Sequence, residues 1–113
     1  MLLLLTIPVM ANVISDTMQN RSGIVYLYSQ NCRYCVNFEP IYKQFEQKYN
    51  KIYKFKKIDV YSKQGRDLAR EYKVYSVPTV LVFNSETKKT AIVVTDCMFD
   101  FACLEKEVIN FIK

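Results

Sequence analysis

Two patterns of apolar residues alternate along the chain. Unbroken apolar runs are typical of buried strands, and they predict strands at residues 24–28, 55–60 and 80–83. Apolar residues spaced three and four apart are typical of amphipathic helices, and they predict helices at residues 12–18, 36–50, 62–72 and 101–112. A polar loop and an apolar run at residues 91–94 predict a further strand, antiparallel to the one before it. The alternation of strands and helices indicates an α/β fold built on a parallel sheet.

Single residues mark where these helices begin, end or bend. Asn12 and Asp100 have side chains that can cap the first and last helices. Gly23 is expected to close the first helix and to release the chain into the following strand. Pro40 lies inside the second helix, where it lacks an N–H group and should bend the helix. Its presence points to a required bend, with a kink that has no role as the alternative.

The first eleven residues allow two interpretations. Residues 2–7 form an apolar run that Pro8 ends, and they would make a good buried strand. The same run, with small residues near Ala11, also has features of a signal-peptide remnant. The first basic residue is Arg21, however, so this numbering includes no basic segment before the apolar run. We expect one domain over residues 1–113, without a transmembrane helix.

Composition narrows the possible functions. The chain has 113 residues, of which 50% are hydrophobic and 24% charged, as is typical of one globular domain. It has no histidine, which excludes Ser-His and Cys-His catalytic pairs and most catalytic metal sites. The net charge is +5, and lysines cluster between residues 48 and 57. No nucleic-acid motif accompanies them, so we expect a solvated rim and no nucleic-acid partner. We also expect no metal or organic cofactor.

The sequence Cys32-Arg33-Tyr34-Cys35 lies between a predicted strand and a predicted helix. A cysteine at a helix N-terminus faces unpaired N–H groups and the positive end of the helix dipole, which stabilise its thiolate. The second sulfur lies one turn further along, close enough to attack a disulfide formed on the first. Such a pair can also be half of a zinc site or two small buried residues. The rest of the sequence has to distinguish these alternatives.

Three separated features resemble the thioredoxin-like superfamily. They are the strand followed by Cys32 and Cys35, Pro40 in the same helix, and Val77-Pro78-Thr79 before the next buried strand. The resemblance covers residues 12–112, and also residues 1–11 if these form the first strand. It implies a thioredoxin fold, in which helices flank a central mixed sheet of four or five strands. It also implies a cis peptide bond between Val77 and Pro78.

The resemblance further implies roles for individual residues. Cys32 would be the exposed attacking thiol, and Cys35 the more buried resolving thiol. The backbone of Val77 would pair with an extended substrate segment, and Pro78 would pack against the disulfide. Three side chains are expected to shape the rim of the site: Tyr28, Arg33 and Tyr34.

Several positions differ from thioredoxins proper, which carry Trp-Cys-Gly-Pro-Cys and a buried acid on the preceding strand. Tyr26 occupies the position expected for that acid, which helps to deprotonate the resolving thiol. Lys57 matches a lysine common in the family, but its acidic partner is missing. Glu39 could replace that partner only by bending inward, and we expect it to be solvated. These differences argue against fast reduction of the thioredoxin type.

The two residues between the cysteines are also informative. Tyr34 resembles the Cys-Pro-Tyr-Cys motif of glutaredoxins, but glutathione recognition usually needs a later Gly-Gly pair, and no glycine follows Gly65. Residues 28–40 are more similar to exported bacterial thioredoxin-like proteins, including those of conjugative plasmids. Arg33 places a fixed positive charge beside Cys32, which should stabilise the reduced dithiol. We therefore expect a couple more oxidising than thioredoxin.

A second pair of cysteines, Cys97 and Cys103, lies near the last helix. Residues i and i+6 of one continuous helix face different sides and cannot bridge. A disulfide could form if Cys97 lay in the loop before the helix and Cys103 in its first turn. We expect two unpaired structural thiols, with a second disulfide as the alternative and no zinc shared between the two pairs.

Together these observations predict a monomeric thiol–disulfide oxidoreductase that exchanges disulfides with protein substrates and with an unidentified redox partner. Whether it oxidises, reduces or isomerises depends on its potential and on that partner. A redox-silent protein-binding module is one alternative, although both cysteines of the motif are present. A cytosolic electron donor to a reductase such as ribonucleotide reductase is another. We expect an exported, periplasmic protein, with the cytoplasm as the alternative location.

Overall fold

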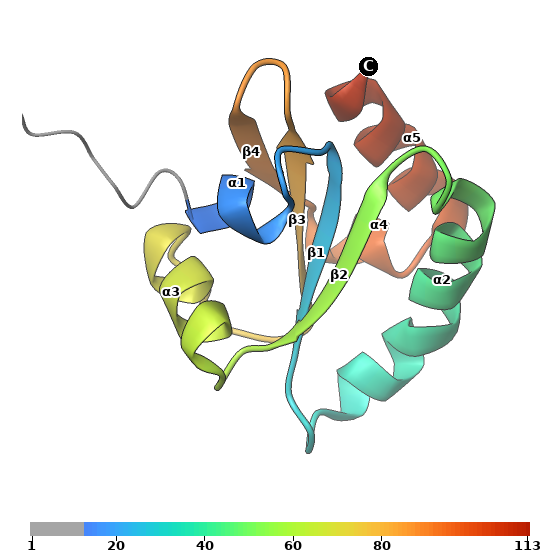
Figure 1. Cartoon of the computed structure of the whole chain (residues 1–113). Helices are drawn as coiled ribbons and strands as arrows, with labels where there is room; N and C mark the ends of the chain where they lie inside the picture. Colours follow the sequence, from blue (N-terminus) through green and yellow to red (C-terminus); the bar gives the residue numbers. More distant parts are fainter. Residues whose placement is uncertain (1–12) are drawn as a thin grey trace, which may run out of the picture.

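A computed structural model describes residues 13–113 of the chain (Figure 1). The two interpretations of residues 1–11, and the capping role expected for Asn12, fall outside these described residues. None of the helices formed by residues 13–113 combines the length and the apolar composition needed to cross a membrane.

Four strands form one mixed sheet in the described part of the chain, in the order β2-β1-β3-β4. Their bounds are Gly23–Tyr28 (β1), Lys54–Asp59 (β2), Thr79–Asn84 (β3) and Lys89–Ile92 (β4). β1 pairs parallel with β2, whereas the β1–β3 and β3–β4 pairs are antiparallel. The mixed sheet implied by the resemblance is therefore confirmed, whereas the parallel pairing expected from the alternation of strands and helices holds for β1 and β2 and not for β1 and β3. The predicted edge strand lies at residues 89–92 instead of 91–94.

Helices cover both faces of this sheet (Figure 1). Their bounds are Val13–Thr17 (α1), Arg33–Tyr49 (α2), Lys63–Glu71 (α3), Thr95–Met98 (α4) and Phe101–Ile112 (α5). On one face α2 and α5 pack over Ile24 and Tyr26 of β1, and on the other α1 and α3 pack over Val25 and Leu27. Both faces of β1 are thus buried, which explains its unbroken apolar run.

The first helix ends differently from the expectation. α1 ends at Thr17, and the chain turns through Gln19 and Asn20, whose φ angles are 54° and 58°. Gly23 is instead the first residue of β1, and a Cβ atom there would lie 1.8 Å from the backbone oxygen of Lys54. Glycine is therefore required at this position for the close approach of β1 and β2.

The segment before the last helix contains a short helix that the sequence pattern does not predict. α4 has only four residues, too few to show a helical period. Phe99 and Asp100 separate it from α5. Asp100 caps α5 as predicted, because its carboxylate accepts a hydrogen bond from the Cys103 N–H at 3.2 Å.

Candidate functional site

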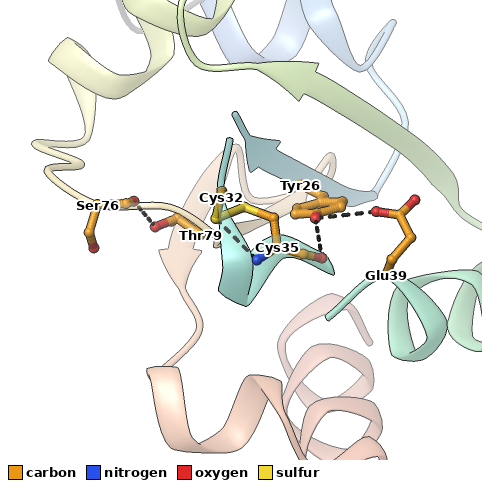
Figure 2. Close-up of a disulfide and its surroundings, with 6 residues drawn as sticks. All are labelled: Tyr26, Cys32, Cys35, Glu39, Ser76 and Thr79. Carbon is orange, nitrogen blue, oxygen red and sulfur yellow. Dashed lines mark hydrogen bonds between the residues drawn. A yellow bond between two sulfur atoms is a disulfide. The ribbon is translucent and has the colours of Figure 1, made fainter. Parts of the chain in front are cut away.

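A disulfide joins Cys32 and Cys35 at the start of α2, with their Cα atoms 5.2 Å apart (Figure 2). Cys32 is the N-cap residue of the helix, and its sulfur accepts a hydrogen bond from the Cys35 N–H at 3.0 Å. This donor and the helix dipole also stabilise a thiolate at Cys32 when the pair is reduced. Cys32 is half-buried, whereas Cys35 is only 4% exposed. Cys32 is thus the more accessible of the two cysteines, and Cys35 is the more protected one.

A groove runs along one side of this turn. The Val77–Pro78 peptide bond is cis, as the resemblance implies. The loop that contains it is held by the Thr79 hydroxyl, which donates to the Ser76 carbonyl at 2.8 Å (Figure 2). The groove has a volume of about 520 Å³, and its lining comprises Tyr34, Asn37, Ser76, Val77, Pro78, Thr95, Asp96 and Phe99. Three of the predicted site residues are therefore brought together here: Tyr34, Val77 and Pro78.

The other two predicted rim residues lie elsewhere. Tyr28, at the end of β1, lines a second cavity of about 380 Å³ that also contains Cys32 and Cys35. Arg33, the first residue of α2, is exposed and lines neither the groove nor this cavity. The rim expected from the sequence is therefore divided between two sides of the disulfide.

Glu39 bends inward, contrary to the expectation that it is solvated. Its Oε1 atom accepts a hydrogen bond from Lys57 Nζ at 2.9 Å, so the predicted absence of an acidic partner for Lys57 is also wrong. Glu39 follows Cys35 by four residues on α2 and therefore lies on the same side of the helix. Its side chain is only 26% exposed and shares the second cavity with both cysteines.

Tyr26 connects this carboxylate to Cys35. Its hydroxyl lies 3.3 Å from Glu39 Oε2 and 3.2 Å from the Cys35 carbonyl oxygen, so its one hydrogen can be donated to either acceptor or shared between them (Figure 2). Burial raises the pKa of Tyr26 well above its ordinary value, and the Glu39 carboxylate raises this pKa further. Tyr26 therefore remains a neutral hydroxyl donor. A tyrosine on β1 and an acid on α2 therefore lie together beside Cys35.

Cys97 and Cys103 form a second disulfide, with their Cα atoms 5.2 Å apart, which corrects the prediction of two unpaired thiols. The structure is closer to the alternative considered from the sequence, because Cys97 lies before the last helix, in α4, and Cys103 lies in the first turn of α5. The break between these helices lets the two side chains meet. Within residues 13–113, no three His, Cys, Asp or Glu side chains are grouped so as to hold a metal ion.

We expect that replacing both Cys97 and Cys103 with alanine lowers the free energy of unfolding by about 2 kcal/mol, since the disulfide closes a short loop. Denaturant unfolding of the two proteins, each with Cys32 and Cys35 oxidised, measures this difference. The m-value provides the control, because an unchanged m-value attributes the shift to stability alone. Equal midpoints for the two proteins would contradict the expectation.

Sequence reasoning misses the wall of the groove that faces Tyr34 and Pro78. That wall comes from Thr95, Asp96 and Phe99, which belong to α4 and to the residue after it. The predicted cap at Asp100 was the available signal, because it indicates that the chain before it is outside the last helix.

Comparison with known proteins is consistent with this geometry. The family model described as thioredoxin matches residues 9–98. The fold is similar to that of the J-Trx1 fragment of ERdj5, with a TM-score of 0.69 and 17% identity over 88% of this chain and 47% of that fragment. It is also similar to a reduced thioredoxin pre-protein of Schistosoma mansoni, with a TM-score of 0.66 and 23% identity over 88% of this chain and 87% of that one. Oxidised thioredoxin O2 of Arabidopsis thaliana gives a TM-score of 0.66 and 20% identity, over 90% and 85% of the two chains. No curated protein sequence matches.

Proposed function

The chain belongs to the thioredoxin family of thiol–disulfide oxidoreductases, and from this premise we propose that it acts as a monomer on protein substrates, with Cys32 attacking and Cys35 resolving. One observation carries the assignment of these roles. The half-buried Cys32 caps α2 beside the Val77–Pro78 groove, while Cys35 is buried one turn further along. A substrate disulfide can therefore reach the first sulfur and not the second.

The exchange proceeds in two displacements. The Cys32 thiolate attacks one sulfur of a substrate disulfide, forming a mixed disulfide and releasing the other substrate sulfur as a thiolate. Cys35 then loses its proton and attacks the Cys32 sulfur, which forms the Cys32–Cys35 disulfide and releases the second substrate thiolate. Two electrons pass from the protein to the substrate, and the reverse sequence oxidises a substrate dithiol.

Reduction of insulin disulfides tests the proposed function directly. The reduced protein is expected to generate two substrate thiols for each Cys32–Cys35 disulfide formed. Protein that has been alkylated in its reduced form provides the control, and it should generate none. Equal thiol release by the alkylated and untreated proteins would contradict the proposal.

The charge beside Cys32 supports a couple more oxidising than thioredoxin, whose potential is about −270 mV. Arg33 is exposed and forms no ion pair with another described residue, so its charge is available to the Cys32 thiolate. An exposed charge contributes less than about 1 kcal/mol, and about 1.4 kcal/mol corresponds to 30 mV.

We expect the potential of the pair to lie above that of thioredoxin, and Arg33→Gln to lower it by about 10–20 mV. Titration against glutathione redox buffers measures both values. Lys43→Gln, which removes an exposed charge further along α2, is the matched control and should leave the potential unchanged. A wild-type potential as low as that of thioredoxin would contradict the expectation.

An exported, periplasmic location is part of the proposal. The Cys97–Cys103 disulfide supports it, because structural disulfides persist in oxidising compartments. Mass spectrometry of the mature N-terminus provides the test, with loss of the apolar segment at residues 2–7 as the expected result. Retention of this segment in the mature protein would favour the alternative of a cytosolic electron donor.

A further inference from the structure

The groove beside Pro78 has a second wall that the exchange chemistry does not use. Thr95 and Asp96 of α4, followed by Phe99, face Tyr34 and Pro78 across this groove. Phe99 is held in place by the core, because its ring packs edge-on against Phe38 with the ring centroids 5.9 Å apart. The wall is therefore a fixed aromatic surface next to the redox turn.

Asp96 gives this wall its charge. Among the described residues that line the groove, it is the only formally charged side chain. It is exposed and forms no ion pair with any of residues 13–113. The whole protein carries a net charge of +5. The Asp96 carboxylate therefore places a local negative charge in the groove of a positively charged protein. A cation on a bound segment would find its partner there.

The second disulfide fixes where this carboxylate lies. Asp96 is adjacent to Cys97, which is joined to α5 through Cys103. Cys97 and Met98 are buried, with exposed fractions of 8% and 1%. A four-residue helix has little stability of its own, so these anchors hold α4 against the groove. Asp96 is thus presented at a defined position relative to Pro78.

We propose that α4 determines which protein disulfides are attacked: those in an extended segment that carries a lysine or arginine and an apolar side chain close to the cysteine. The apolar side chain packs against Phe99 and Pro78, and the cation faces Asp96. This inference rests on the proposed function, since the same groove must hold the substrate segment during exchange. An exposed ion pair accounts for a preference of about threefold to fivefold in rate.

Synthetic peptides provide the test. Each contains one cysteine in an otherwise neutral extended sequence, joined by a disulfide to 2-mercaptoethanol, with lysine or glutamate on one flank of the cysteine or on the other. The Cys32 thiolate attacks the peptide sulfur and releases 2-mercaptoethanol, and Cys35 then releases the peptide thiol. The second-order rate constant for oxidation of the reduced protein, measured by acid quench, gives a lysine-to-glutamate ratio for each flank.

The comparison of two matched variants decides the outcome. Asp96→Asn should lower the ratio about threefold to fivefold on one flank, and added salt should reduce this difference. Glu86→Gln makes the same change in net charge in the turn after β3, at the far end of that strand from Pro78, and should keep the wild-type ratio. Equal ratios in the two variants would overturn the inference while leaving the exchange activity established. Failure of the wild-type protein to react with any peptide would instead overturn the proposed function.

Discussion

Replacing Cys35 with serine is expected to convert the protein into a trap that holds its substrates as mixed disulfides on Cys32. The first displacement needs only the Cys32 thiolate, which keeps its place at the start of α2. The second displacement has no nucleophile, so turnover in insulin reduction should fall by a factor on the order of a thousand. Non-reducing electrophoresis followed by mass spectrometry detects the captured species.

Cys32→Ser provides the first control for this experiment and should capture nothing, because Cys35 is buried. The double replacement of Cys97 and Cys103 with alanine is the second control, and it should accumulate no mixed disulfide, because Cys35 is still present to resolve it. If Cys32→Ser captured substrates as readily as Cys35→Ser, the assignment of the two thiols would be reversed. Capture by neither variant would favour the redox-silent binding module.

The strands and long helices could be predicted because each has a recognisable apolar pattern within its own sequence. β1 and β3 are unbroken apolar runs since both of their faces are buried, and α2 repeats its apolar positions over 17 residues. α4 could not be predicted in this way, because its four residues are held by burial and by a disulfide to α5. The wrong prediction for Cys97 and Cys103 follows from that omission.

The candidate site could also be predicted only in part, because some of its residues are placed by local sequence motifs and others by contacts with residues distant in the sequence. The positions of Cys32, Cys35 and Pro78 follow from sequence motifs. The inward position of Glu39 depends on Lys57 in β2 and Tyr26 in β1, two elements that only the tertiary structure brings to α2. Its separation of four residues from Cys35 was the local signal, because residues i and i+4 share a helix face.

This arrangement indicates a role for Glu39 in the second displacement. Cys35 must lose a proton when it attacks the mixed disulfide, and the Glu39 carboxylate lines the same cavity of about 380 Å³. A cavity of this size, in which Glu39 and Lys57 supply polar groups, has room for a water molecule that carries the proton between them. Lys57 holds the carboxylate in place through its hydrogen bond of 2.9 Å. Tyr26 supports the carboxylate from the other side, at 3.3 Å.

Glu39→Gln is therefore expected to slow resolution of the mixed disulfide by about 10- to 100-fold at pH 7, within the range for loss of a proton acceptor. The difference from wild type should shrink above the ordinary thiol pKa of about 8.5, because the thiolate then forms without an acceptor. Rapid-quench measurement of resolution between pH 6 and about pH 9.5 shows both effects. Glu46→Gln, which makes the same charge change on α2 outside the cavity, should match wild type at every pH. A rate loss in Glu39→Gln that is equal at all pH values would indicate that Glu39 only supports the local structure.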